Sequence, residues 1–249
     1  MAGRFITFEG GEGAGKSTQI KRLAASLRMI SVDVVVTREP GGTPGAEAIR
    51  HVLLSGAAKS LGGEAEAMLF AAARVDHVDR LIKPALVKES WVLCDRFSDS
   101  TRVYQGASGV DPSMLLTLEH VATNGLAPDL TIILDVPAEV GMKRALKRAK
   151  SNKEPDLDRF EQDGLDVHVE RRNAFLTIAE AEPDRCVVID ANTTQKKTAD
   201  AIWREVLARF EGSFETDPQA GRSNGNSSKK TSSLFDNVDA SLNLVRAAN

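Results

Sequence analysis

The sequence predicts an α/β domain of three layers, in which a five-stranded parallel sheet is covered by helices on both faces. Three observations support this fold class. Five short runs are rich in β-branched and other apolar residues, longer segments with helical periodicity separate them, and the runs are continuously apolar rather than alternating. Strands that are apolar on both sides are typical of parallel sheets buried between layers of helices. The composition, 42% apolar and 27% charged, suits a globular domain.

The five predicted strands are short and end close to charged or polar residues. They are residues 4–9 (RFITFE), 33–37 (DVVVT), 91–94 (WVLC), 130–135 (LTIILD) and 186–190 (CVVID). In an open parallel sheet, ligands bind beyond the carboxyl ends of the strands. The residues that follow each strand are therefore the first candidates for a functional site.

Helices are predicted between these strands. Residues 17–29 place Ile20, Leu23, Ala24 and Leu27 on one face, which is the spacing of an amphipathic helix. The other predicted helices are residues 46–54, 64–83, 112–123, 138–150, 163–182 and 198–210. The helix at 64–83 is expected to end before Pro84, because proline interrupts helices. Tyr104 is assigned to a loop.

The chain divides into a domain at residues 1–212 and an extension at residues 213–249. The start of the extension is rich in Ser, Gly and Asn and poor in apolar residues. Such composition is typical of low-complexity, disordered segments, because it cannot bury enough apolar surface to offset the entropy of folding.

Charge and hydropathy exclude several classes of protein. The net charge of −3 gives no global basic field that would favour a nucleic-acid partner. No apolar run approaches the roughly 18–20 residues of a membrane span. The N-terminus leads directly into a strand without a signal peptide. Cys94 and Cys186 lie in apolar runs, and a disulfide between them is not expected. These features predict a cytoplasmic protein.

The strongest motif is a phosphate-binding loop, GGEGAGKS, at residues 10–17. It follows a predicted strand and opens a predicted helix, the context that this motif requires. Its glycines allow backbone N–H groups to converge on phosphate oxygens, and the helix N-terminus adds positive potential. We expect Lys16 to contact the β- and γ-phosphates of ATP and Ser17 to bind Mg²⁺. The predicted ATP-binding residues are Gly10, Gly11, Glu12, Gly13, Ala14, Gly15, Lys16, Ser17 and Thr18.

A second acidic group is expected beside this loop. The strand WVLC is followed directly by Asp95 and Arg96. An acidic residue at the end of an apolar strand is the usual partner of a phosphate-binding loop, close to the metal. Ser17 and Asp95 are therefore the predicted metal residues, with Asp95 orienting the metal or its water rather than acting as a base.

Two other classes of phosphate-loop protein fit poorly. A GTPase would carry an N-K-x-D motif after an apolar strand, and residues 152–156 (NKEPD) miss that pattern by one position. An ABC-type ATPase would carry an LSGGQ-like sequence, which residues 54–57 (LSGA) begin but do not complete. A motor or helicase would need a longer chain.

Further residues after the strands suit a small nucleotide acceptor. Phe70 and Arg74 share one helix face at i and i+4. Arginines grip phosphate through their planar fork, aromatic rings stack on bases, and an amide can bind the edge of a base. The candidates for such contacts are Arg38, Arg50, Phe70, Arg74, Arg96, Tyr104 and Gln105.

At this point the sequence resembles a known family, the bacterial form of thymidylate kinase among the P-loop nucleoside-monophosphate kinases. The resemblance covers about residues 3–210 and not the extension. The motifs that carry it are FEGGEGAGKST at 8–18, TREPGGT at 37–43, EAMLFAAAR at 66–74, VLCDRFSDSTRVYQG at 92–106, NGLAPDLTIILDV at 124–136 and DRFE at 158–161.

The resemblance implies roles at the base and the sugar of the acceptor. Phe70 would stack on thymine, and Arg74 and Gln105 would hydrogen-bond the edge of the base. Thr101 occupies the position where a hydroxyl residue near the base is expected. Tyr104 would lie beneath the sugar and crowd out a 2′-hydroxyl group, which would select deoxyribose.

The resemblance also implies contacts to the rest of the acceptor. Glu12 would approach the 3′-hydroxyl group, and Arg38, Arg50 and Arg96 would surround the acceptor phosphate. The implied reaction is ATP + dTMP → ADP + dTDP, with Mg²⁺, in the synthesis of dTTP for DNA replication. A homodimer that meets through helix faces is implied as well. Kinases for another nucleoside monophosphate and a nucleotide-dependent switch are the alternatives.

Residues 143–160 are predicted to form a mobile lid that closes over the ATP phosphates and excludes water. Gly13 stands where some relatives carry an arginine in the loop, and relatives with glycine there supply a catalytic arginine from the lid. Arg148 is the first candidate and Arg144 the second. The segment KSNKEPDL is longer than the compact lid of bacterial relatives. Outside the lid, Arg102 is also unusual, because a small or apolar residue is common at that position. The basic residues of this stretch are Lys143, Arg144, Lys147, Arg148, Lys150 and Lys153.

The predicted chemistry needs no strong general base, because the acceptor phosphate is already anionic near neutral pH. An acceptor oxygen would attack the γ-phosphorus in line. Catalysis would then consist of positioning and charge neutralisation by Lys16, Mg²⁺ and the arginines. Lys16, Asp95, Arg96 and Arg148 are the predicted catalytic residues.

Overall fold

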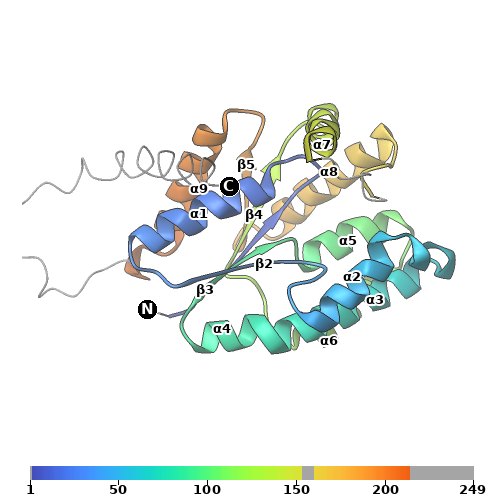
Figure 1. Cartoon of the computed structure of the whole chain (residues 1–249), viewed down its shortest axis with the longest axis horizontal. Helices are drawn as coiled ribbons and strands as arrows, with labels where there is room; N and C mark the ends of the chain where they lie inside the picture. The colour runs from blue at the N-terminus through green and yellow to red at the C-terminus, as the bar shows by residue number, and fades with distance from the viewer. Residues whose placement is uncertain (1, 153–159, 214–249) are drawn as a thin grey trace, which may run out of the picture.

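The computed structural model describes residues 2–152 and 160–213 and contains the predicted parallel sheet. Its strands are β1 (Phe5–Glu9), β2 (Val34–Arg38), β3 (Trp91–Asp95), β4 (Leu130–Asp135) and β5 (Cys186–Asp190), in the order β2-β3-β1-β4-β5 (Figure 1). The central strand β1 pairs in parallel with β3 and β4, and Ile6 stands opposite Leu93 and Leu130. The carboxyl ends of all five strands therefore open at one edge of the sheet.

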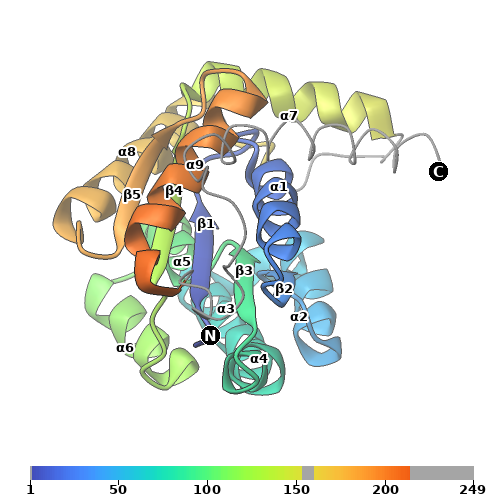
Figure 2. The ribbon, with the colours of Figure 1, turned by 90° about the vertical axis from the view of Figure 1, so that its left-hand side faces the viewer.

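Helices cover both faces of this sheet, as predicted. The helices α1 (Lys16–Met29) and α9 (Gln195–Arg209) pack on one face, and α4 (Lys83–Val87), α5 (Ser98–Ala107) and α8 (Leu165–Ala181) pack on the other (Figures 1 and 2). The helices α2 (Pro44–Leu54), α3 (Gly63–His77) and α6 (Pro112–Thr123) lie side by side beyond α5, and α7 (Ala138–Asn152) crosses above the sheet edge.

Alternate residues of the strands fill two separate cores. Ile6, Phe8 and Leu93 point toward α1 and α9, whereas Phe5 and Val92 point toward α4. Successive side chains of a strand point to opposite faces, so continuously apolar strands are what a sheet covered on both sides requires. This confirms the physical basis of the predicted fold class.

The helix α5 was not predicted, and the assignment of Tyr104 to a loop is wrong. Tyr104 lies within α5 and is buried. The buried side of this helix is mostly polar, since it includes Asp99, Thr101 and Gln105. Helical periodicity of apolar residues was therefore absent, although the segment is helical.

The expectation that a helix ends before Pro84 is also wrong. After α3, a π turn at Val78–Ile82 continues the helical path into α4, which runs to Val87. The N–H of Lys83 donates to the carbonyl of Val78, five residues earlier. Pro84 then lies in the first turn of α4, where its missing N–H is tolerated.

Some sequence-based expectations fall outside the described residues. One is the extension at 213–249, of which all but residue 213 lies outside. The other is residues 153–159 of the predicted lid, which include Lys153 and the first two residues of the DRFE motif. The two thiols, Cys94 and Cys186, are free and buried. Across residues 2–152 and 160–213, none of the helices has the length and apolar character that crossing a membrane would demand.

Candidate active site

A cavity of about 510 Å³ opens at the carboxyl edge of the sheet and brings the predicted site residues together. The phosphate-binding loop forms one end, α3 and α5 form the other, and the start of the lid lies above. Predicted residues that line it are Glu12, Gly13, Gly15, Lys16, Ser17, Thr18, Arg38, Arg50, Phe70, Arg74, Asp95, Arg96, Thr101, Tyr104, Gln105 and Arg148. Gly10, Gly11 and Ala14 belong to the loop but do not line the cavity.

The loop between β1 and α1 has the backbone of a phosphate cradle. Gly10, Gly13 and Gly15 all have positive φ, which glycine alone adopts readily. A Cβ added at Gly15 would meet no atom within 4 Å, so the backbone there is open to a ligand. The Nζ of Lys16 donates to the carbonyl oxygens of Gly10 at 2.9 Å and Gly11 at 3.0 Å. The lysine is thereby held across the cradle.

The loop also packs directly against the base of the lid helix. A Cβ added at Gly13 would stand 2.8 Å from the carbonyl carbon of Gly141 in α7 and closer still to its oxygen. The φ of Gly13 is +67°. Both facts exclude a larger side chain at position 13 unless α7 moves. They give a structural reason why this loop carries no arginine there.

Ser17 and Asp95 lie in contact at the start of α1 and the end of β3. The Ser17 hydroxyl donates to Asp95 Oδ2 at 2.6 Å. In the described part of the chain, no group of three or more His, Cys, Asp or Glu residues is close enough to hold a metal ion. Mg²⁺ commonly binds proteins through one or two side chains and takes its other ligands from phosphates and water. The Ser17–Asp95 pair fits that mode.

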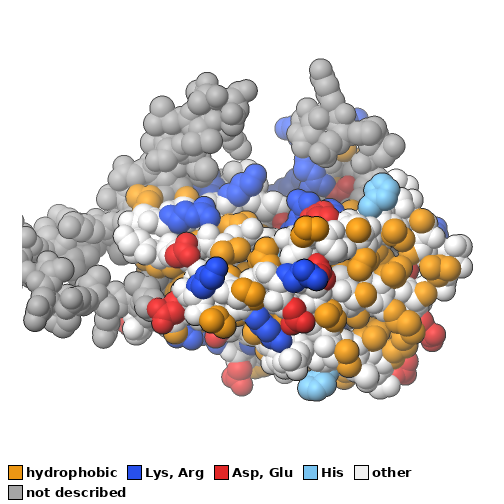
Figure 3. All heavy atoms as spheres, turned by 60° about the horizontal axis from the view of Figure 1, so that its bottom comes forward, with side chains coloured by type: hydrophobic (Ala, Val, Ile, Leu, Met, Phe, Trp, Pro, Cys, Tyr) orange, Lys and Arg blue, Asp and Glu red, His pale blue; other side chains and the backbone are white. Residues whose placement is uncertain are grey.

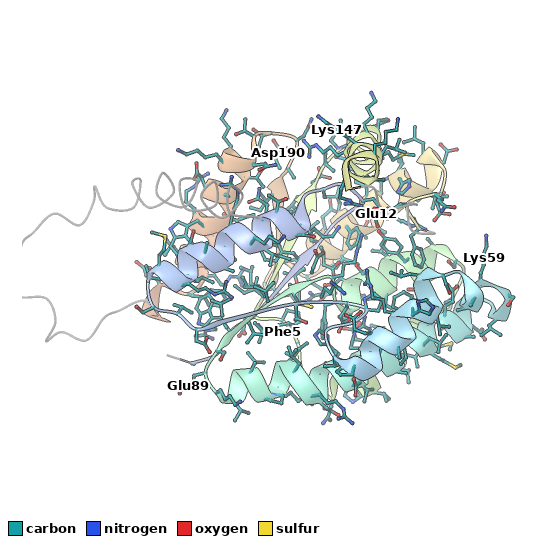
Figure 4. The ribbon with its side chains drawn as sticks, in the orientation of Figure 1. Phe5, Glu12, Lys59, Glu89, Lys147 and Asp190 are labelled. Atoms are coloured by element: carbon teal, nitrogen blue, oxygen red, sulfur yellow. The ribbon has the colours of Figure 1, made fainter. Side chains whose placement is uncertain are left out.

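Glu12 joins the phosphate loop to β3 and α5. Its Oε1 accepts a hydrogen bond from Arg96 at 2.5 Å and another from the Tyr104 hydroxyl at 2.7 Å. Burial alone would raise the pKa of Glu12, but Arg96 and then Lys16 outweigh it and lower the pKa to about 2. Glu12 is therefore ionised at neutral pH, and it lies beneath α7 (Figure 4).

Arg96 has a left-handed backbone, with φ of +69°, immediately after β3. Its side chain reaches Glu12 in the phosphate loop through Nη2, and its Nη1 donates to Ser100 Oγ of α5 at 3.0 Å. Its guanidinium also lies 5.0 Å from the centre of the Tyr104 ring. Arg96 thus lies between the phosphate loop and α5.

Sequence reasoning missed Glu9, which closes β1 beneath this arginine. Its carboxylate is fully buried and accepts hydrogen bonds from the Phe97 N–H at 2.7 Å and the Ser100 hydroxyl at 2.6 Å. Burial, followed by the nearby Asp99, raises the pKa of Glu9 to about 7, and Arg96 opposes that rise. In the sequence, Glu9 is marked only as the last residue of a strand.

The far end of the cavity combines aromatic rings with polar side chains. Phe70 stands at its wall, with its ring centre 6.3 Å from that of Phe160. Arg74 donates through Nη2 to Thr101 Oγ1 at 2.8 Å. Gln105 is 1% exposed, and neither its amide oxygen nor its amide nitrogen has a hydrogen-bond partner. A buried amide without partners is costly, so a ligand is expected to supply them.

Arg38 and Arg50 line the cavity, and both guanidinium groups already have hydrogen-bond partners within the protein. Arg38 is largely exposed and pairs with Glu47 at 3.1 Å. Arg50 donates to the carbonyl of Pro40 at 2.7 Å. These two arginines can reach an anion in the cavity only by exchanging or sharing those contacts.

Two lid arginines differ in where they lie. Arg148 lines the cavity and forms an ion pair with Glu161. Arg144 donates instead to the carbonyl oxygen of Ala191, beyond β5, at 3.0 Å. The geometry favours Arg148, the first candidate, over Arg144.

Sequence reasoning also missed Glu39 and His77, which are buried and hydrogen-bonded to each other across 38 positions of the chain. Glu39 is hydrogen-bonded to Arg74 as well and lines the cavity beside it. Arg102, which departs from the family pattern, is partly exposed and pairs with Glu182 at 2.6 Å and with Asp99 at 3.2 Å. No periodicity marks Glu39 or His77, and only the fold shows that they are partners.

Comparison with known proteins gives one consistent result. A family model described as thymidylate kinase matches residues 8–202. A thymidylate kinase of Rhodopseudomonas palustris (strain BisB18) is 57% identical over 210 residues, which are 84% of this chain and 90% of that protein. One of Afipia carboxidovorans is 54% identical over 209 residues, with the same shares covered. A crystal structure of thymidylate kinase from Ehrlichia chaffeensis is 31% identical with a TM-score of 0.66, over 83% of this chain and 100% of that one.

Proposed function

Because this chain belongs to the thymidylate kinase family and phosphorylates dTMP with a nucleotide phosphate donor, we propose that the donor is ATP, that it binds with Mg²⁺, and that the cavity holds both substrates. The donor would take the end formed by the phosphate loop, and dTMP the end formed by α3 and α5. The observation that carries this proposal is the buried Gln105 amide, which has no partner and faces the same cavity as the loop.

The donor end fits a magnesium–triphosphate pair in its chemistry. The open backbone at Gly15 and the N-terminus of α1 would receive phosphate oxygens. Lys16 would exchange its carbonyl contacts for phosphate contacts. Ser17 and Asp95 would hold the metal, directly or through water. When bound, ATP supplies the transferable phosphoryl group, and Mg²⁺ supplies positive charge beside it.

The acceptor end fits a pyrimidine base with carbonyl groups. Phe70 would stack on the ring. Gln105 offers both a donor and an acceptor, so it matches an edge that carries a carbonyl next to an N–H. Arg74 and Thr101 would complete this polar wall. A base that lacks the matching edge would leave buried groups unpaired, which is how such sites reject analogues.

Sugar and phosphate would lie between the two ends. Glu12 would accept from the 3′-hydroxyl group, and the Tyr104 ring would restrict the space for a 2′-hydroxyl. Arg96 would face the acceptor phosphate, with Arg38 and Arg50 at the entrance.

Transfer would then depend on charge neutralisation by fixed cations. Arg96 is held by Glu12 before substrate binds, and Lys16 would exchange its carbonyl contacts when the donor binds, so both would be in place at the moment of transfer. Arg148 would add positive charge when the lid closes, in exchange for its pairing with Glu161. Asp95 would orient the metal or its water, and no general base is required.

A steady-state assay of the purified protein tests the donor, the metal and the base. ATP, GTP and CTP are compared as donors, with Mg²⁺ or with a chelator, and dTMP, dUMP and dCMP as acceptors. We expect ATP with Mg²⁺ and dTMP to give the highest kcat/KM, and Gln105→Ala to raise the KM for dTMP at least tenfold with the KM for ATP unchanged. Turnover that survives the chelator, or an unchanged KM for dTMP in Gln105→Ala, would contradict the proposal.

A homodimer is the second part of the proposal, and a surface feature supports it. Exposed apolar side chains gather over α2, α3, α6 and the short helix Ala57–Leu61, where Figure 3 shows a broad hydrophobic area. They are Val52, Leu61, Met68, Val75, Leu116 and Val121. Contact through this face would leave the cavity open. Sedimentation should find a dimer in the wild type and a monomer in Met68→Glu, while a wild-type monomer would contradict it.

We also propose that residues 1–212 form the whole catalytic domain. The family match ends at residue 202, within the proposed domain of residues 1–212. A chain truncated after residue 212 should keep its kcat/KM within about twofold, and a large loss would show that the extension takes part.

The free, buried thiols suit the reducing cytoplasm, which we propose as the compartment.

A further inference from the structure

Behind the acceptor end of the cavity, a continuous chain of hydrogen bonds runs from β2 to α5. Thr37 Oγ1 lies 2.7 Å from His77 Nε2, and His77 Nδ1 lies 3.0 Å from Glu39 Oε1. The second oxygen of Glu39 accepts from Arg74 Nε at 2.8 Å. Arg74 Nη2 then donates to Thr101 at 2.8 Å. The chain thus links a strand to a residue on the wall of the cavity.

Every member of this chain is buried, and His77 has no exposed surface at all. Glu39, Arg74 and Thr101 line the cavity, whereas His77 does not. His77 is hydrogen-bonded to Glu39, so it acts on the cavity through Glu39 and, beyond it, through Arg74. The chain has one end at the substrate site and the other in the protein interior.

The charges within the chain determine what His77 does. A buried carboxylate is costly unless its oxygens are paired, and Arg74 balances the charge of Glu39 through one of them. The other oxygen needs a donor, which a proton on Nδ1 of His77 supplies. The Nε2 of the same ring lies within hydrogen-bond distance of the Thr37 hydroxyl. With both oxygens engaged, the carboxylate of Glu39 cannot rotate.

The geometry of α3 allows Arg74 and His77 to hold Glu39 together. Arg74 and His77 are three residues apart on the helix, so both side chains reach Glu39 from one face. Two of the three guanidinium nitrogens of Arg74 are then fixed, one by Glu39 and one by Thr101. The plane of the guanidinium is set before a substrate binds.

The loop after β2 packs against the contact between Thr37 and His77. Gly42 has a φ of +89°, and a Cβ added there would stand 2.6 Å from His77 Nε2. The loop backbone therefore lies directly on the contact between Thr37 and His77 and covers it. The sequence TREPGGT thus carries a carboxylate that points inward and a glycine that allows the loop to cover the histidine.

We propose that His77 is a positioning residue for base recognition, which holds Arg74 through Glu39 in the orientation that selects a pyrimidine with a carbonyl group at position 4. This inference rests on the proposed function, in which Arg74 faces the base. An N–H of Arg74 can donate to a carbonyl of thymine but not to the amino group of cytosine. Loss of the His77 contact frees Glu39 and lets the guanidinium turn, which weakens that distinction.

Three variants of the full chain test the proposal in assays with dTMP, dCMP and ATP. His77→Leu removes the donor to Glu39, and His77→Asn keeps an N–H near the Nδ1 position. We expect His77→Leu to raise the KM for dTMP about tenfold and to lower the preference for dTMP over dCMP by a similar factor, with the KM for ATP and kcat within about threefold. His77→Asn should recover most of both effects. Thr37→Val, a milder change at the far end, should raise the KM for dTMP about threefold.

Several results would overturn the inference. An unchanged KM for dTMP in His77→Leu, or equal losses for all substrates, would reduce His77 to a structural residue. If His77→Leu does not fold, an unchanged KM in Thr37→Val decides against the proposal. Arg74→Met separates failure of the proposed base recognition by Arg74 from failure of the role of His77. If Arg74→Met does not raise the KM for dTMP, base recognition by Arg74 itself is wrong. An increase in Arg74→Met but not in His77→Leu would reject only the role of His77.

Discussion

The backbone of Gly13 lies directly against the backbone of Gly141, so the phosphate loop and the first turn of α7 form one packed unit. The approach is reciprocal, because a Cβ added at Gly141 would overlap the carbonyl oxygen of Glu12. The helix that carries Arg148 therefore starts from a point fixed on the loop that we propose to hold the donor phosphates. Movement of the lid is expected beyond this contact rather than at it.

Substitution of Gly13 should uncouple the loop from the lid helix. Gly13→Ala has to displace Gly141 and adopt a positive φ, so we expect a loss of about 2–3 kcal/mol in the free energy of unfolding. The KM for ATP should rise as well. Gly11→Ala is the matched control, because a Cβ there meets no atom within 4 Å and its φ is not positive. Urea denaturation measures both, and equal stability of the two variants would contradict the packing argument.

Arg148 should carry the lid's contribution to catalysis. Its side chain lines the cavity and is 52% exposed, so its removal costs little stability. An arginine over a transferring phosphoryl group contributes about 10³–10⁵ in rate in other phosphate-loop enzymes, and we expect Arg148→Ala to lower kcat by about 10³. Arg144→Ala, the control, should keep kcat within about fivefold. A larger loss in Arg144→Ala would transfer the role to that residue.

The strands and the phosphate loop could be predicted from sequence because their signals are local. Each strand is a continuous apolar run, and the loop is a fixed spacing of glycines before Lys16. The helix α5 could not be predicted in this way. Its buried face carries Asp99, Thr101 and Gln105. Asp99 and Thr101 have partners far along the chain, in Arg185 and Arg74, and Gln105 is the residue whose partners we propose to come from a ligand.

The same reasoning explains which site residues were missed. Glu39 and His77 are 38 positions apart, and neither is remarkable without the other. A buried carboxylate is recognisable only when its partners are known, and the fold supplies those partners. The resemblance to a family identified most of the residues that face the cavity, but not Glu39, which also lines it, nor His77, which is hydrogen-bonded to Glu39 from the interior.

Arg185 should be among the most important charges for stability. It donates to both oxygens of the fully buried Asp99, at 2.8 and 2.7 Å, and to Thr131 at 2.8 Å. Breaking a buried pair by removing one partner costs about 3–5 kcal/mol. Without Arg185, the buried Asp99 would keep only the longer contact to Arg102 at 3.2 Å. We expect this loss for Arg185→Met in chemical denaturation.

A second variant separates the ion pair from simple packing. Asp99→Asn combined with Arg185→Met removes both charges, so it should be more stable than Arg185→Met alone. If the double variant is as unstable as the sum of the single ones, the loss does not come from an unpaired Asp99.

Glu9 should make the stability of this protein depend on pH between about 4.5 and 7. Burial, then Asp99, raises its pKa to about 7 in the folded state, from 4.5 as the ordinary value. The folded state therefore binds more protons than the unfolded state in this range. The stabilisation is fully present below pH 4.5 and is lost as the pH rises through 7. The difference in pKa corresponds to about 3 kcal/mol.

Glu9→Gln is the variant that isolates this effect, since its amide does not titrate. We expect the wild type to lose about 3 kcal/mol relative to Glu9→Gln as the pH is raised from 4.5 to 7.5, measured as free energies of unfolding in urea. Glu12 does not interfere, because its pKa of about 2 leaves it ionised in the folded state throughout this range. Parallel pH profiles of the two proteins would mean that Glu9 titrates at its ordinary pKa, and that the cations near it compensate its burial in full.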